Sequence, residues 1–190
     1  MPITGAPGHA TPQVSELGEA AGTEAAAALA GLAALTFPLA CPPGSDPQDI
    51  EAFIAGHLTA DHFADHMAAA DRTVLCARDE DGTPVGYCLL VHGAEPVFSG
   101  PGSLRYRPTV GLDKFYIHPD HHGRGVSARL MTAALGAGRR TGARGIWLGV
   151  NQQNARAGRF YAKSGFSRVG VRTFRMGSRT EHDFILERAL

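Results

Sequence analysis

A glycine-rich segment in the middle of the chain has the residue types that hold phosphate groups. It reads His122-Gly123-Arg124-Gly125-Val126-Ser127-Ala128 and lies between a predicted strand and a predicted helix. Glycine allows the backbone to turn back on itself and present successive N–H groups to one anion. The start of the following helix adds a partial positive charge. The segment therefore predicts a site for a phosphate or pyrophosphate, with a ligand-free glycine turn as the alternative.

Two common nucleotide-binding motifs do not fit this segment. Gly123, Gly125 and Ala128 match the letters of the dinucleotide-binding fingerprint. That fingerprint follows its strand directly and needs an acidic residue about 20 positions later. Here the residues from His118 to His122 intervene, and no acidic residue lies between Asp120 and Glu181. The Walker A motif also fails, because no Gly-Lys-Ser/Thr follows.

A second segment with chemically useful side chains follows the next predicted strand. It begins at Ile146 and reads IWLGVNQQNARAGRFYAKSGF. Asn151 and Asn154 supply amide groups just after the strand, and Tyr161 supplies a hydroxyl group on the next predicted helix. Asn154 can bind a ligand or cap that helix. Tyr161 can donate a proton or simply pack in the core, so both interpretations stay open for each residue.

Together the two segments resemble the acetyl-CoA site of the GNAT superfamily of N-acetyltransferases. The family's phosphate loop reads Gln/Arg-x-x-Gly-x-Gly/Ala, and the second segment is similar to its Asn-x-x-Ala and Phe-Tyr-x-x-x-Gly-Phe motifs. This chain departs from the loop pattern at His122 and at Ser127. Both changes are tolerable because backbone N–H groups hold the phosphates. The resemblance covers residues 73–189 and implies no particular acceptor.

The resemblance implies a role for each part of the site. Backbone N–H groups of residues 114–117 would polarise the thioester carbonyl, and one preorganised donor of this kind contributes about 3 kcal/mol. Tyr161 matches the family's general acid. Asp113, the only acid on its strand, is a candidate base or a structural partner for an arginine, on the opposite face from Lys114; water relays commonly replace a single base in the family. The residues expected to bind the co-substrate acetyl-CoA are Phe115, Tyr116, Ile117, His122, Gly123, Arg124, Gly125, Val126, Ser127, Ala128, Asn151 and Asn154.

Three histidines in the N-terminal half have a spacing that metal sites use. His62 and His66 lie four residues apart on a predicted helix, with His57 nearby. The glutamate of the His-Glu-x-x-His motif is missing, and no further set of ligands is evident. We therefore expect no metal. The remaining hypothesis is that these histidines line the acceptor pocket, which in this superfamily lies against the N-terminal helices.

Hydrophobic patterning predicts the elements that must position these residues. Helices are predicted at 24–35, 50–58, after Thr59, at 127–138 and at 154–164, and strands at 73–77, 85–91, 112–117, 146–150, 166–174 and 183–186. Asp81-Gly82 predicts a hairpin between the first two strands. This order indicates a mixed α/β domain, and the resemblance implies the GNAT fold, with helices flanking a central mixed sheet that is splayed at the acetyl-CoA site. We expect a flexible segment over 1–22 and one N-acetyltransferase domain over 23–190.

The net charge of zero hides two opposed halves. Residues 1–100 sum to −11 and residues 101–190 to +11. A basic half indicates an anionic partner. The basic residues beside the two motifs, which can meet the phosphates of CoA, are Arg124, Arg129, Arg156, Arg159 and Lys163. Basic and aromatic residues do not alternate as in RNA-binding proteins, so we expect no nucleic-acid partner.

Cysteine usage and hydropathy bear on the compartment. Cys41, Cys76 and Cys88 predict reduced thiols rather than a disulfide framework. The first basic residue is Arg72, so a signal peptide is not expected. The apolar run 25–35 is shorter than the roughly 18 residues of a membrane span. We expect a cytoplasmic protein without a membrane partner, and sixteen Arg against two Lys indicate a GC-rich, bacterial genome.

These observations predict an acetyl-CoA-dependent N-acetyltransferase that moves an acetyl group to an amine of a small molecule or peptide by direct attack. An idle acyl-CoA-binding module, used for sensing or oligomerisation, is one alternative. A metal-dependent hydrolase built on the histidines is another. The acidic N-terminal half is consistent with a cationic acceptor such as a polyamine or an aminoglycoside, and a homodimer is a further expectation.

Overall fold

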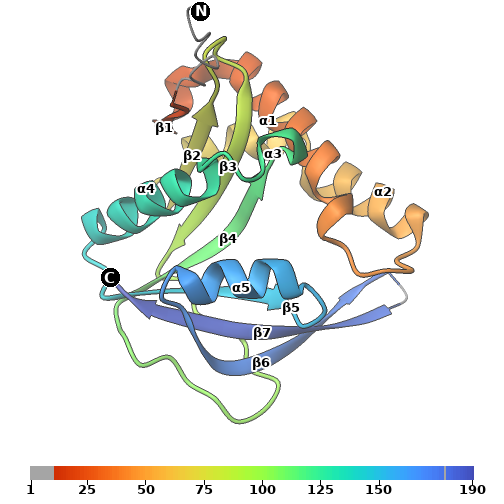
Figure 1. Cartoon of the computed structure of the whole chain (residues 1–190), viewed down its shortest axis with the longest axis vertical. Coiled ribbons are helices and arrows are strands. Elements are labelled where there is room, and N and C mark those ends of the chain that lie inside the picture. Colours follow the sequence, from red (N-terminus) through yellow and green to blue (C-terminus); the bar gives the residue numbers. More distant parts are fainter. Residues whose placement is uncertain (1–10, 178) are drawn as a thin grey trace, which may run out of the picture.

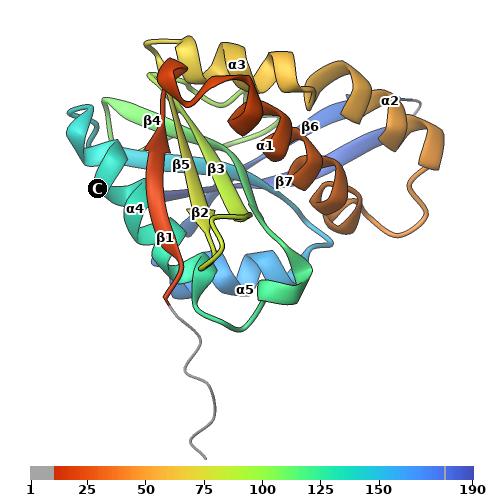
Figure 2. The same ribbon diagram turned by 90° about the horizontal axis from the view of Figure 1, so that it is seen from above.

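The structure is a computed structural model that describes residues 11–177 and 179–190. Its strands form one seven-stranded mixed sheet in the order β1-β2-β3-β4-β5-β7-β6. Helices α1, α2 and α3 cover one side of the sheet, and α4 and α5 cover the other (Figures 1 and 2). The strands are β1 (Gln13–Leu17), β2 (Arg72–Arg78), β3 (Pro84–His92), β4 (Thr109–Ile117), β5 (Gly145–Asn151), β6 (Ser167–Met176) and β7 (Arg179–Ala189), and the helices are α1 (Gly22–Thr36), α2 (Pro47–His57), α3 (Ala60–Ala68), α4 (Val126–Arg140) and α5 (Ala155–Lys163). The predicted mixed α/β fold is confirmed.

The central strands β4 and β5 separate after a short parallel pairing. Residues 109–111 of β4 pair with residues 145–147 of β5. Beyond that point β4 remains paired with β3, and β5 remains paired with β7. Figure 1 shows the result, in which β1–β4 fan away from β5, β7 and β6. The splay that the family resemblance implies is therefore present.

A β-bulge in β4 lies where this splay begins. Leu90 of β3 is opposite Leu112, but Leu89 is opposite Lys114, so Asp113 is the extra residue. The bulge reverses the alternation of side chains along the strand. Leu112 before it and Phe115 after it pack into the same core, although they are three residues apart.

Two hydrophobic cores hold the sheet between its helices. On one side Leu29 and Ala33 of α1 and Phe63 of α3 pack with Val74 and Tyr87 of the sheet. The other core is formed by α4, α5 and the opposite face of the strands. Residues Glu19–Ala40 are helical, long and apolar enough to cross a membrane by length and composition. Leu29 and Ala33 of this segment are buried against the sheet, and core helices of soluble proteins pass the same test of length and composition.

The expectation of a flexible segment over 1–22 is wrong for its second half. Gln13–Leu17 forms β1, which pairs antiparallel with β2 along its whole length. Glu16 of β1 also accepts a hydrogen bond of 2.7 Å from Arg140 of α4. Residues 1–10 lie outside the described part of the chain. Hydrophobic patterning does not predict this strand, because its sequence, QVSEL, has only two apolar residues and no period-two pattern.

The loop between β3 and β4 is fastened to the sheet by a buried carboxylate. Glu187 of β7 is 1% exposed. Its two oxygens accept hydrogen bonds of 2.9–3.1 Å from the backbone N–H groups of Arg105 and Tyr106. Both carboxylate oxygens of Glu187 thus hold the β3–β4 loop in place.

Candidate active site

The start of α4 offers backbone N–H groups to an anion. Gly123 and Gly125 both have φ of +78°, a conformation that favours glycine, and Gly125 is the N-cap of the helix. Val126 directs its side chain into a small core with Ala77 and Val85, so only its backbone faces the loop. The N–H groups of the first turn have no partner within a helix. The first turn of α4 contains no acidic residue, so no negative side chain there repels an anion.

His122 turns back toward the strand that precedes the loop. Its Nε2 lies 3.1 Å from the carbonyl oxygen of Ile117. Burial, and then the nearby Arg156, lower the pKa of His122 below its usual value. The imidazole therefore fastens the loop to the end of β4, and its neutral form is favoured.

A cleft of about 480 Å³ opens where β4 and β5 diverge. Its walls come from the edges of β4 and β5, from α5, from the β6–β7 hairpin, from α2 and from the segment that follows α1. Six residues singled out in the sequence line this cleft: Asp113, Phe115, Tyr116, Asn151, Asn154 and Tyr161. The glycine loop and Ile117 lie outside its lining, toward the N-terminus of α4. The structure thus brings the candidate general acid and the splayed strand edges into one cleft.

Tyr161 is held by aromatic packing at the base of this cleft. Its ring contacts Phe115 of β4 and Phe166, with centroid distances of 6.3 and 5.8 Å. The residue is 8% exposed. Burial, and then the proximity of Cys88, raise the pKa of Tyr161 well above its usual value. Its hydroxyl is protonated at neutral pH, as that of an ordinary tyrosine already is, and the raised pKa makes it a weaker acid.

Asp113 does not lie on the face opposite Lys114. The two side chains form an ion pair, with Lys114 Nζ 2.5 Å from Asp113 Oδ2, and both residues line the cleft. The prediction that Asp113 and Lys114 lie on opposite faces of the strand is wrong, because the bulge at Asp113 breaks the strict alternation of side chains. The structural partner foreseen for Asp113 is therefore present, although it is a lysine rather than an arginine.

Both asparagines already have partners within the protein. Asn154 Oδ1 accepts a hydrogen bond of 3.0 Å from the N–H of Ala157, which makes Asn154 the N-cap of α5. This bond uses the amide oxygen and not the nitrogen. Asn151 Nδ2 donates a hydrogen bond of 2.9 Å to Glu181 Oε2. The capping interpretation of Asn154 is confirmed, and its contact with CoA stays a prediction.

The cleft also contains charged and aromatic residues that the sequence motifs did not indicate. Arg172 donates two hydrogen bonds, of 2.9 and 3.0 Å, to Asp183 Oδ2. Burial raises the pKa of Asp183, and Arg172 acts in the opposite direction. The other such lining residues used below are Phe37, Phe53, Phe174 and Glu181. They belong to no motif, because the fold alone brings the α1–α2 region against the β6–β7 hairpin.

Comparison with known sequences decides the family. Residues 39–166 match the Acetyltransferase (GNAT) family. This chain is a GNAT acetyltransferase. It is 43% identical over 162 residues to an uncharacterized N-acetyltransferase of Mycobacterium tuberculosis, an alignment that covers 85% of this chain and 96% of the relative. The chain is therefore an acyltransferase of the N-acetyltransferase class.

Comparison with solved structures agrees on the fold. The PaiA N-acetyltransferase of Thermoplasma acidophilum, solved in complex with coenzyme A, has a TM-score of 0.74 at 19% identity. That comparison covers 95% of this chain and 100% of the other. An aminoglycoside 6'-acetyltransferase of type Ii has a TM-score of 0.64 at 17% identity, covering 93% and 96% of the two chains. At these identities the likeness concerns the GNAT fold and not the acceptor.

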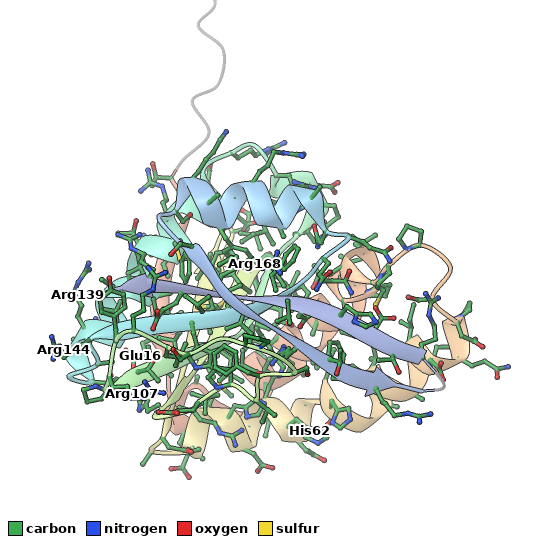
Figure 3. The ribbon with its side chains drawn as sticks, turned by 90° about the horizontal axis from the view of Figure 1, so that it is seen from below. Glu16, His62, Arg107, Arg139, Arg144 and Arg168 are labelled. Carbon is green, nitrogen blue, oxygen red and sulfur yellow. The ribbon has the colours of Figure 1, made fainter. Side chains whose placement is uncertain are left out.

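The histidines of this GNAT chain do not line its cleft. His57 is exposed and packs on Phe53, at a centroid distance of 4.7 Å. His62 lies 2.7 Å from the hydroxyl of Thr59, on α3 near the rim of the molecule (Figure 3), and His66 contacts the guanidinium of Arg72. Within the described residues, no three His, Cys, Asp or Glu side chains are grouped as metal ligands. The three histidines instead contact residues of their own region, and whether they line the acceptor pocket stays a prediction.

Proposed function

We propose that this GNAT enzyme transfers the acetyl group of acetyl-CoA to an amine of a small molecule or peptide by direct attack. The observation that carries the proposal is that Tyr161 and the open edges of β4 and β5 line one cleft. The Thermoplasma acidophilum neighbour, which holds coenzyme A, supports acetyl-CoA as the donor. A cytoplasmic location is part of the same proposal, since all three cysteines are free thiols.

The two ends of the proposed donor site have complementary chemistry. The pyrophosphate of CoA would accept hydrogen bonds from the N–H groups at the start of α4, where the helix dipole favours an anion. Its pantetheine arm would lie between β4 and β5, whose facing edges have no strand partner beyond Gly111 and Trp147 in the described part of the chain. Unpaired strand edges offer both N–H and C=O groups to the amides of such an arm.

Two groups of this chain would stabilise the reaction. As the amine attacks, the thioester carbonyl oxygen gains negative charge, and backbone N–H groups of β4 beyond the bulge would donate hydrogen bonds to it. When the carbon–sulfur bond breaks, the hydroxyl of Tyr161 would give its proton to the departing sulfur. A CoA thiol should have a pKa near that of cysteine, about 8.5, so this proton transfer assists departure without being indispensable.

The attacking ammonium must first lose a proton. Asp113 is held by the ammonium of Lys114, which makes it a poor candidate for the single base. We infer that water in the cleft carries the proton out, past the carboxylates and amides that line it. No residue is assigned as the base.

A thiol-release assay with acetyl-CoA tests the proposed function. The protein would be offered a panel of amines, aminoglycosides and peptides with free N-termini. An active transferase releases CoA thiol above the hydrolysis background with at least one of them. Binding of CoA without thiol release across the whole panel would favour the idle acyl-CoA-binding module instead.

A further inference from the structure

Glu181 is a buried carboxylate in the cleft whose hydrogen bonds are incomplete. The residue lines the cleft and is 5% exposed. One oxygen, Oε2, accepts a hydrogen bond from Asn151. The other, Oε1, has no hydrogen-bond partner among the described residues. A buried charged group usually has its hydrogen bonds filled, because an unfilled one costs free energy.

Arg179 forms an ion pair with Glu181 but does not hydrogen-bond its Oε1 atom. Arg179 Nε is 3.6 Å from Glu181 Oε1, which is beyond hydrogen-bond distance. The guanidinium of Arg179 instead donates through Nη1 to the carbonyl oxygen of Gly44, in the loop between α1 and α2. A ligand cation that displaces the Arg179 side chain would gain a charge-assisted hydrogen bond with Oε1.

Glu181 lies at the end of the cleft away from the proposed chemistry. The last pair between β5 and β7 is Asn151 with Asp183, and Glu181 is two residues farther along β7, about 7 Å by the rise of a strand. Tyr161 packs in the opposite direction, against Phe166 and the core that includes Leu186. Figure 1 shows this end of the β6–β7 hairpin reaching toward the α1–α2 loop. A molecule that reaches both Glu181 and Tyr161 must therefore carry two separate functional groups.

The surface near Glu181 suits an apolar connection between those groups. Phe37 and Phe53 stack with centroids 4.5 Å apart and line the cleft. Phe174 is the strand partner of Glu181 and lines it as well. Aromatic faces attract both methylene groups and cations.

From these contacts we propose that Glu181 binds a second ammonium group of the acceptor, so that the enzyme prefers diamines with an apolar connecting chain. One nitrogen is acetylated near Tyr161 while the other donates to Glu181 Oε1. This inference rests on the proposed acetyltransferase activity, and it names a class of acceptor that the family assignment leaves open.

Matched pairs of acceptors test the inference. We would measure kcat/KM for α,ω-diaminoalkanes from 1,3-diaminopropane to 1,6-diaminohexane against n-alkylamines with the same number of carbons. We expect at least one diamine to exceed its monoamine by about tenfold or more, the scale of one hydrogen bond to a charged group. Glu181→Gln should bring that ratio close to one, mainly through KM for the diamine, while monoamine turnover changes little.

Glu187→Gln is the control, because it removes a buried carboxylate from the same strand outside the cleft. It should lower the melting temperature and keep the diamine preference. Arg179→Ala removes the cation that competes for Glu181 and should lower KM for the preferred diamine. This variant tests the inference even if Glu181→Gln does not fold. Equal kcat/KM for diamines and monoamines in the wild type, or a preference that survives Glu181→Gln, would overturn the inference. Absence of thiol release above the hydrolysis background with every amine, diamines and monoamines alike, would instead sink the proposed function.

Discussion

Burial has different consequences for two tyrosines of this protein. Tyr161 lines the cleft, where burial raises the pKa of its hydroxyl, and in the proposed reaction this hydroxyl lies beside the place where a thiolate would leave. Tyr87 is 0% exposed in the opposite core, and its hydroxyl has no hydrogen-bond partner within the described residues. The first hydroxyl is the one that we propose acts on the substrate, whereas the second loses its hydrogen bonds because its ring is packed between Phe63 and Tyr116.

Tyr161→Phe should lower kcat by roughly one to three powers of ten, near the usual contribution of about 10²–10⁴ for general acid–base catalysis. The ring packing is kept, so KM for acetyl-CoA should change little. Steady-state thiol release measures both constants. An unchanged kcat would remove Tyr161 from the mechanism.

Tyr87→Phe provides the matched control for that substitution. It removes a buried hydroxyl of the same chemical type outside the cleft, so kcat should stay at the wild-type level. Because the lost group is unsatisfied, the free energy of unfolding should rise, by about 1 kcal/mol. Urea denaturation checks the second expectation, and a loss of stability would show that the hydroxyl is satisfied after all.

His66 should make stability depend on pH. Burial, and then the cations Lys114 and Arg72, lower the pKa of His66 to about 4. The unfolded chain takes up a proton near pH 6.5, the usual value, and the folded chain does so only near pH 4. Between these values the unfolded state binds more protons, so stability falls as the pH falls.

Melting temperatures between pH 7 and pH 4.5 would show this effect as a difference between variants. His66→Gln, which does not titrate, should lose less stability on acidification than the wild type. His57→Gln, at an exposed position, should follow the wild-type curve. Parallel curves for all three proteins would contradict the neutral state of the half-buried His66.

At the scale of elements, α4 depends on the backbone conformation of its N-cap. Gly125 has φ of +78° and open space around the position of a Cβ atom. An L-residue there is strained by about 1–2 kcal/mol and relaxes by turning the neighbouring N–H groups. Gly125→Ala should therefore raise the Kd for CoA by about tenfold, the equivalent of 1.4 kcal/mol.

Gly142 is a suitable control for this substitution. Its φ is +79°, it also has open space around it, and it lies beyond the opposite end of α4. Gly142→Ala should cost similar stability without changing the Kd for CoA. Isothermal titration of both variants separates the two effects, and equal weakening of CoA binding would mean that the phosphates do not sit on this loop.

Much of the fold follows from local pattern, and the acceptor side of the site does not. Helical spacing around Leu29 and the Asp81-Gly82 turn predicted α1 and the β2–β3 hairpin, because both signals lie within a few residues. The bulge at Asp113 depends on the register between two strands, which no local pattern reports. Glu181 lines the cleft only because β7 lies beside β5. Its position in the cleft therefore could not be predicted from the local sequence.

At the scale of the whole molecule, the zero net charge separates into an acidic and a basic half. Arg107, Arg139 and Arg144 come from the basic half, and Figure 3 shows them on one side of the molecule, with Glu16 of the acidic half labelled among them. Residues 121–180 hold twelve Lys and Arg and no acidic residue, and they include the glycine loop and α5. This segment would attract the phosphates of CoA before any contact forms.

The attraction should weaken with salt. The screening length falls from about 10 Å at 0.1 M salt to about 3 Å at 1 M, so KM for acetyl-CoA should rise several-fold over that range. Acetyl-dephospho-CoA, which lacks the 3'-phosphate, should show a shallower rise. Steady-state kinetics at several salt concentrations measure both slopes, and a KM independent of salt would contradict the electrostatic role of the basic half.

The most direct test of acetyl transfer follows the acetyl group itself. Enzyme, acetyl-CoA labelled in the acetyl group, and an amine that supports thiol release would be incubated together, and the masses of protein and small molecules measured over time. Direct attack predicts one acetylated amine for each thiol released, with the mass of the protein unchanged. Thiol release without acetylated amine, or label retained on the protein as an intermediate, would contradict it.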